Sequence, residues 1–320
     1  MDLRDFIKSV NEKTPFKGLI KYNEPMFKHT SFRTGGEADV LIRPGKTVFP
    51  SWTATMLSEA KSNGIPVFIL GGGANLLVSD KGIRGIVLDT GSWRGMVRCN
   101  TVGDVCKIKV LSGTIVDNLT DILASRGFSG MEFLAGMPGS VGGAVWMNAR
   151  CYEKSISDVL MDTEIVDFTN SIDENFNIRV IPFNEKDFSY KKSPFQNKDV
   201  LILSATFRLC FRDSLEIKTE MSKYRRDRED KGHYRFPSAG SVFKNNHNFG
   251  IPSGKIIDDL GLRGLKKGDA QIAPWHGNII INTGNASSSD IYYLIGEVKR
   301  RVKEEKGFEL ETEIILVGEW

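Results

Sequence analysis

The sequence predicts an α+β protein of several domains in which two glycine-rich loops face one ligand. With 320 residues, the chain is longer than a domain with a single hydrophobic core usually is. Strand and helix patterns alternate at the start of the chain, and a strand-rich region follows. The glycine-rich loops occupy residues 71–77 and 136–144, one in each of these regions. A ligand bound by both loops would therefore lie between two parts of the chain.

The first domain is expected over residues 1–94. Apolar, β-rich runs predict strands at 38–42, 66–70 and 85–89. A helix is predicted over 51–63, because Trp52, Met56 and Ala60 recur at helical spacing and Gly64 can end it.

The second domain is expected over residues 95–212 and is mainly β. One helix is predicted at 115–126, with Gly127 as its stop. The predicted strands of this domain are 105–111, 159–168, 177–181 and 201–208.

The third domain is expected over residues 213–320. Ser287 is a suitable N-cap for an amphipathic helix that Gly307 ends. The remaining elements are a highly charged helix at 215–231, a short helix at 253–260 and strands at 278–282 and 310–317. Alternation in the last strand would place Glu311 and Glu313 on one face.

The glycine loops are suited to phosphate. Glycine lacks a Cβ, so several backbone N–H groups can converge on one anion. The first loop follows the apolar run 66–70 but has no Gly-Lys-Ser/Thr ending and opens no amphipathic helix. A P-loop and a Rossmann turn are therefore disfavoured. The alternative is that each loop is only a tight turn.

Composition excludes several classes of protein. The net charge of +3 gives no support for binding nucleic acid or an anionic membrane. The chain carries no signal-peptide pattern and no apolar stretch of membrane-spanning length, which predicts a cytoplasmic protein. Its four cysteines and four histidines lack metal-site spacing, so we expect no metal and reduced thiols.

An ordered set of motifs runs through most of the chain. Its segments are 30–38, both glycine loops with 147–149, 238–245, 254–258, 261–264, 270–271 and 310–313. This set, which its order makes specific, resembles the UDP-N-acetylenolpyruvoylglucosamine reductase family. Little room lies between the strand at 201–208 and Arg228, so the chain resembles the shorter class that lacks a substrate-capping insertion.

The resemblance implies an FAD-binding domain of the vanillyl-alcohol-oxidase (PCMH) type in two subdomains, followed by a C-terminal substrate domain. NADPH would be the co-substrate, FAD would be held non-covalently, and a UDP-sugar would be the small-molecule partner. No obligate protein partner is inferred. The implied FAD-binding residues are Gly71, Gly72, Gly73, Ala74, Asn75, Leu76, Gly136, Pro138, Gly139, Ser140, Gly142, Gly143 and Asn148.

The implied reaction reduces the enolpyruvyl group of UDP-N-acetylglucosamine enolpyruvate to UDP-N-acetylmuramate for bacterial peptidoglycan. Ser241 matches the family's proton donor, with Ser238 as a rival of the same type. Glu313 matches an acid near the substrate carboxylate, and Glu311 stays an alternative.

One matching position departs from the family. The family's Tyr-Arg-x-Ser is here Tyr190-Lys191-Lys192-Ser193, so Lys191 takes the place of an arginine that helps to hold the enolate and carboxylate. Lysine keeps the charge but not the planar fork. Arg150 and Asp269 stand where the family commonly has glycine, and Arg150 is a candidate replacement for the missing guanidinium.

The resemblance also implies a substrate-binding set: Arg228, Lys231, Lys244, Asn245, Lys255 and Gln271. Two other functions stay open at this point. One is a different FAD oxidoreductase of the same fold, and the other is a catalytically impaired flavin-binding or nucleotide-sugar-binding homologue, which Lys191 would suit.

Overall fold

The computed structural model describes residues 2–170 and 176–320. The chain divides into two compact units, each made of separate segments. Unit 1 comprises Met1–Tyr22, Val40–Gly72 and Gly85–Arg225; unit 2 comprises Asn23–Asp39, Gly73–Arg84 and Arg226–Trp320. The division into three domains at residues 94 and 212 stays a prediction.

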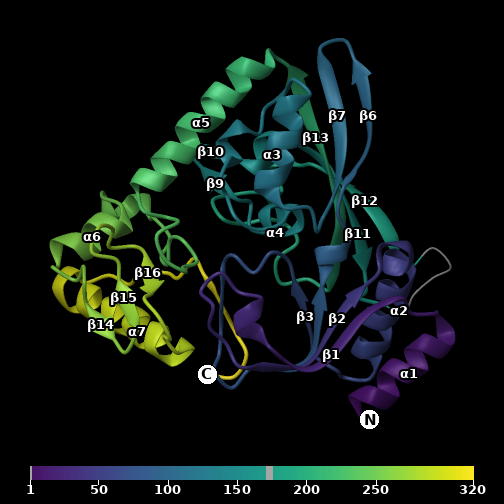
Figure 1. The fold of residues 1–320 in the computed structure, drawn as a ribbon, viewed down its shortest axis with the longest axis horizontal. Coiled ribbons are helices and arrows are strands. Elements are labelled where there is room, and N and C mark those ends of the chain that lie inside the picture. Colours follow the sequence, from purple (N-terminus) through teal and green to yellow (C-terminus); the bar gives the residue numbers. More distant parts are fainter. Residues whose placement is uncertain (1, 171–175) are drawn as a thin grey trace. The chain divides into compact units, whose positions relative to one another are not determined.

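The N-terminal four-stranded sheet has the order β1-β2-β5-β3, in which β3 and β5 run parallel (Figure 1). Its core contains Phe6 from helix α1 and Trp52 from helix α2, both completely buried. The predicted helix at 51–63 is confirmed and begins two residues earlier. The bounds are α1 Leu3–Lys13, β1 Gly18–Pro25, β2 Glu37–Pro44, α2 Phe49–Ser62, β3 Val67–Leu70 and β5 Ile83–Asp89.

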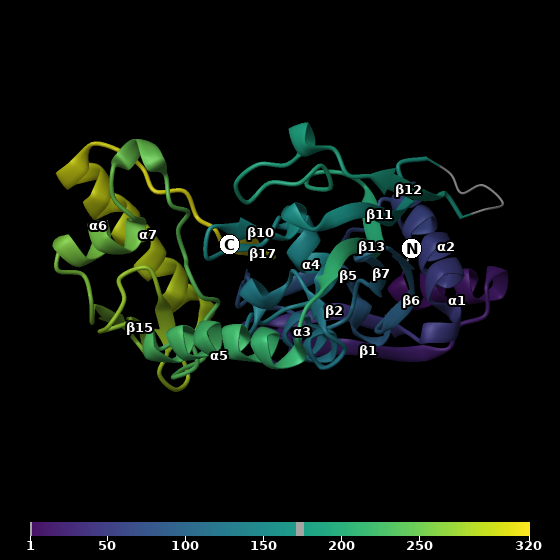
Figure 2. The same ribbon diagram turned by 90° about the horizontal axis from the view of Figure 1, so that it is seen from above.

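The largest sheet belongs to unit 1 and has the order β12-β11-β13-β7-β6, with β8 paired to β13. Within this sheet, β11 is antiparallel to both β12 and β13, and these three strands can be followed in Figure 2. Apolar residues of helices α3 and α4 share a core with this sheet. The bounds are β6 Met96–Val102, β7 Val105–Leu111, α3 Val116–Ser125, β8 Phe128–Ser129, α4 Val141–Trp146, β9 Arg150–Cys151, β10 Lys154–Ser155, β11 Leu160–Asp167, β12 Ile178–Pro182 and β13 Val200–Phe211.

The cysteines differ from expectation at one position. Cys106, in β7, is disulfide-bonded, whereas Cys151 and Cys210 form no disulfide. The prediction of reduced thiols is therefore wrong for Cys106. The spacing of cysteines in the sequence could not reveal this bond, because a disulfide depends on the distance between Cβ atoms in the fold.

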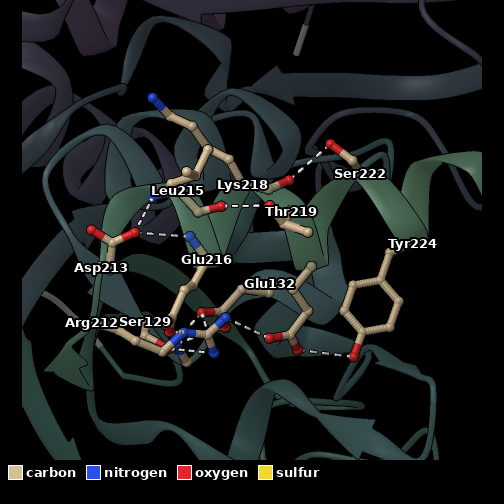
Figure 3. A network of polar contacts seen from close by, with 12 residues as sticks. Ser129, Glu132, Arg212, Asp213, Leu215, Glu216, Lys218, Thr219, Ser222 and Tyr224 are labelled. Carbon is tan, nitrogen blue, oxygen red and sulfur yellow. Dashed lines mark hydrogen bonds and ion pairs between the residues drawn. The ribbon is translucent and has the colours of Figure 1, made fainter.

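Helix α5 (Ser214–Asp230) is fixed at its start by a polar network in unit 1 (Figure 3). Asp213 accepts hydrogen bonds from the backbone N–H groups of Leu215 and Glu216, which caps the helix. Arg212 pairs with Glu220 at 2.8 Å and with the buried Glu132 at 3.8 Å. The charges at this end of α5 therefore anchor the helix.

Unit 2 contains a small antiparallel sheet, β14-β15-β16, with helices α6 and α7 beside it (Figure 1). Helix α7 begins as predicted: Ser287 and Asp290 form a capping box. It also ends as predicted, at Gly307 in the left-handed conformation (φ 79°). The bounds are α6 Ser253–Asp259, β14 Lys266–Lys267, β15 Ala270–Ile272, β16 Ile280–Asn282 and α7 Ser288–Lys306.

The last strand is shorter than predicted. Strand β17 (Ile315–Val317) runs parallel to β4 (Leu76–Val78), which follows the first glycine loop. Residues 310–314 lie outside any regular strand, with one isolated bridge between Thr312 and Phe243. The predicted strand over 310–317 is therefore wrong for residues 310–314, whereas the shared face of Glu311 and Glu313 stays a prediction.

Across the two described stretches, no helix is both long enough and apolar enough to span a membrane.

Candidate functional site

The two glycine loops contact each other in unit 1. A Cβ added to Gly72 would lie 2.6 Å from the Cα of Gly139, and one added to Gly71 would lie 2.5 Å from the Oγ of Ser140. Real Cβ atoms do not approach so closely, so only glycine permits this contact. The glycines therefore have a packing role that the turn alternative did not include.

This contact leaves backbone donors available. In the part of the chain that the structure describes, no protein acceptor is found for the N–H groups of Gly71, Gly72, Gly139 and Ser140. Clustered backbone N–H groups without partners are the donors that bind phosphate oxygens. The loops therefore fit a pyrophosphate.

The second loop is held in place by Asp117. One of its carboxylate oxygens accepts from the N–H of Gly136 and from Nη2 of Arg225, each at 2.6 Å. The backbone N–H of Val116 also donates to Gly139. Sequence reasoning missed Asp117 and gave Arg225 no role beyond membership of the highly charged helix.

The first loop is connected to the C-terminal segment within unit 2. The side-chain amide of Asn75 donates to the carbonyl of Glu313 at 3.1 Å, and the Asn75 carbonyl accepts from the N–H of Ile315 at 2.9 Å. A predicted cofactor residue and a predicted catalytic residue are thus direct neighbours.

Ser241 and Glu313 are also brought together in unit 2. The N–H of Glu313 donates to the carbonyl of Val242, the residue after Ser241, at 2.7 Å. Glu311 differs from Glu313, because its side chain is 71% exposed and forms an ion pair with Lys244. The geometry therefore favours Glu313 over Glu311 for a role beside Ser241.

Lys191 lies in a tight turn of unit 1. Ser189 and Lys192 exchange backbone hydrogen bonds across the turn, and Lys191 has φ 57°. The amide of Asn148 donates to the Ser189 carbonyl at 2.9 Å, so this turn is attached to the segment after the second loop. Arg150 lies in the same segment, two residues from Asn148, and is exposed.

Four predicted substrate residues have local partners. Lys231 pairs with Asp227, and Lys255 with Asp259, each one helical turn apart. The side chain of Asn245 accepts from the N–H of Ser253, and Gln271 donates to the carbonyl of Gly264. Their binding roles stay predictions.

Family models match two stretches of the chain. Residues 53–172 match an FAD binding domain, and residues 232–317 match the C-terminal domain of UDP-N-acetylenolpyruvoylglucosamine reductase. The reductase of that name from Treponema denticola is 40% identical over 98% of both chains, and the one from Borrelia garinii is 38% identical over 99% of this chain and 97% of its own. The chain belongs to the UDP-N-acetylenolpyruvoylglucosamine reductase family.

A solved member of this family has the same architecture. The crystal structure of the reductase from Thermus caldophilus matches with a TM-score of 0.74 and 30% identity, covering 95% of this chain and all of that chain. The predicted fold class, an FAD-binding domain with a C-terminal substrate domain, is confirmed.

Replacing Gly72 with alanine is expected to cost most of the FAD bound on purification. The added methyl group would collide with the Gly139 backbone and separate the loops. The ratio of flavin to protein absorbance, with the dissociation constant of added FAD, measures the effect. Gly296, an exposed position in α7 with no atom near an added Cβ, gives the control G296A. Equal FAD retention by G72A and G296A would contradict the proposed contact.

Two half-buried histidines of unit 2 were not among the predicted site residues. Burial is the main cause that lowers the pKa of His233 to about 4, and nearby Arg228 lowers it further. Burial also lowers the pKa of His276. Both imidazoles are therefore neutral at pH 7.

The lowered pKa of His233 predicts that the folded protein loses stability in acid. The unfolded chain binds a proton near pH 6.5 and the folded chain only near pH 4, so stability falls as the pH drops through this window, by at most about 1.4 kcal/mol per pH unit. Urea midpoints of the wild-type protein and of His233→Gln at pH 7.5, 6 and 5 test this. The wild-type protein should lose more stability than the variant, and parallel curves would refute the assignment.

Proposed function

We propose that Ser241, Glu313 and Lys191 carry the chemistry of an FAD-dependent reductase that converts UDP-N-acetylglucosamine enolpyruvate to UDP-N-acetylmuramate. The observation that carries the proposal is the hydrogen bond from the Glu313 N–H to the Val242 carbonyl, directly after Ser241. It joins the backbone segments that carry the Ser241 hydroxyl and the Glu313 carboxyl, which are distant in the sequence.

The cofactor is FAD, and the glycine loops supply donors for its pyrophosphate. Gly71, Gly72, Gly139 and Ser140 offer N–H groups that no protein acceptor among the described residues uses. When bound, FAD would supply hydride transfer, with NADPH as the hydride source and the outer carbon of the enolpyruvyl double bond as the acceptor.

Ser241 would complete the reduction by donating a proton to the carbon next to the carboxylate. The hydride and this proton together saturate the double bond. A serine hydroxyl is a weak acid, so this donation requires a strongly basic enolate. The extended segment after Ser241 fixes the backbone from which its hydroxyl projects.

Glu313 and Lys191 would act on the substrate carboxylate and enolate. The Lys191 ammonium supplies a positive charge to the negative enolate, although it lacks the bidentate geometry of arginine. The Glu313 carboxyl, close to another carboxylate, would favour a shared proton between the two groups.

The substrate's UDP moiety would be held by a cationic set in unit 2. Lys244 and Asn245 follow Ser241 directly, and Arg228 and Lys231 lie at the end of α5. Lys255 and Gln271 complete this set. We place the enzyme in the bacterial cytoplasm, in peptidoglycan precursor synthesis, with NADPH and the UDP-sugar as its small-molecule partners.

An anaerobic experiment in two steps tests the function. The purified protein should show flavin absorbance, lose it on addition of NADPH and recover it when the enolpyruvyl UDP-sugar is added. Recovery with UDP-N-acetylglucosamine, which lacks the double bond, should not occur. If the enolpyruvyl substrate fails to reoxidise the bleached flavin, the reductase assignment is contradicted. That result would favour another FAD oxidoreductase or an impaired homologue.

A further inference from the structure

We propose that Asn278 is a positioning residue for proton donation, because its side chain fixes the segment that carries Ser241. The proposal rests on the proposed function of Ser241. Asn278 is only 3% exposed, lies just before β16 and has no assigned role.

The Asn278 amide behaves like a peptide group of a neighbouring strand. Its Oδ1 accepts from the N–H of Phe243 at 2.8 Å, and its Nδ2 donates to the carbonyl of Phe243 at 2.8 Å. The Asn278 backbone carbonyl accepts from the N–H of Val242 at 2.9 Å. One residue therefore satisfies both polar backbone groups of Phe243 and the donor of Val242.

The opposite side of this segment is held by the residues around Glu313. The Glu313 N–H donates to Val242, and the Lys244 N–H donates to the carbonyl of Glu311 at 2.9 Å. Residues 242–244 thus lie between Asn278 on one side and residues 311–313 on the other. Ser241 itself forms a bridge with Ile279, the residue after Asn278. A change at Asn278 would shift Ser241 relative to Glu313.

Asn278 is itself oriented by its neighbours. Its N–H donates to Nδ1 of His276 at 3.1 Å, which requires that this nitrogen carry no proton. A rotated amide would place its NH₂ against the Phe243 N–H and its oxygen against the Phe243 carbonyl, so the two bonds to Phe243 select one orientation. The amide is therefore held in a single orientation before substrate arrives.

Loss of the amide would leave buried groups without partners. Phe243 is 1% exposed, so its N–H and carbonyl have no access to water. An unpaired buried group is costly, so the segment is expected to move toward other partners. A displacement of about 1 Å at reacting groups can lower a rate about a hundredfold.

Asn278→Asp removes one donor and keeps the size of the side chain. Asn282→Asp is the matched control, because Asn282 is also 3% exposed and bonds to backbone groups of Phe32, Gly284 and Ala286. Both variants should melt at lower temperature than the wild-type protein. Stopped-flow flavin absorbance then measures reduction by NADPH and reoxidation by substrate separately, and only in molecules that hold FAD.

N278D should reoxidise about ten- to a hundredfold more slowly than the wild-type protein at pH 8, with reduction by NADPH changed less than twofold. N282D should change neither rate more than twofold. Lowering the pH should partly restore N278D, since a protonated carboxyl can again donate to Phe243. His276 and Asp258 lie near residue 278 and are retained in N282D, so the pH dependence of N282D is the reference for the recovery of N278D.

Several results would overturn the proposal. One is normal reoxidation by N278D, and another is equal slowing in N282D. Loss of FAD from both N278D and Asn278→Ser, which shortens the side chain without adding a charge, would show a purely structural role. Failure of the wild-type protein to reoxidise would instead defeat the proposed function, so the two failures are distinguishable.

Discussion

Ser241→Ala should lower turnover of the enolpyruvyl substrate by about 10²- to 10⁴-fold, the range for loss of a general acid. This substitution removes only the hydroxyl of Ser241. The backbone bridge to Ile279 and the backbone hydrogen bonds of Val242 do not involve that hydroxyl, so they should remain. Bleaching of the flavin by NADPH should continue at the wild-type rate, since no proton donation to substrate occurs in that step. Anaerobic stopped-flow absorbance measures both steps.

Ser238→Ala is the matched comparison for Ser241→Ala. It removes a hydroxyl from the same loop and tests the rival proton donor. Substrate reoxidation should stay within about threefold of wild type in S238A. If S241A turns over normally and S238A does not, the roles of the two serines are reversed.

Lys191→Ala should lower the rate of substrate reduction by about 10²- to 10³-fold, comparable to loss of a group that stabilises developing negative charge. The turn between Ser189 and Lys192 is formed by backbone hydrogen bonds, so its shape does not depend on the Lys191 side chain. Rate constants for reoxidation at saturating substrate, with the KM for substrate, measure the effect.

Two further variants distinguish a role of Lys191 from a role of Arg150. Lys191→Arg introduces the planar fork and should react at least as fast as the wild-type protein. Arg150→Ala removes a cation from the segment that Asn148 attaches to the same turn. A large loss in R150A with a normal K191A would mean that the guanidinium of Arg150 has taken the family arginine's place.

Local patterns predicted the elements whose signals lie within a few residues. The capping residue Ser287 and the stop at Gly307 correctly predicted where α7 begins and ends. The strand predicted at 105–111 has the same bounds as β7. The motifs also led to the family and to FAD, which the comparisons confirm. The predicted site residues themselves await mutagenesis.

The missed features depend on contacts between distant parts of the chain. Asp117 supports the second glycine loop from the start of α3, and Asn278 supports the Ser241 segment through its side-chain amide. Neither residue stands out by type or spacing. The strand predicted at 310–317 is shorter in the structure, because residues 310–314 make an isolated bridge and backbone bonds to residues 242–244 in place of a regular ladder.

The attachment of Asn75 to Glu313 and of β4 to β17 has a consequence for biosynthesis. Residues 73–78 belong to or directly follow the first glycine loop, yet Asn75 and its partner Glu313 are 238 residues apart in the sequence. This half of the loop lacks these contacts on a nascent chain until residues 313–317 have been synthesised. We therefore expect the first glycine loop to complete its FAD-binding shape only after that point.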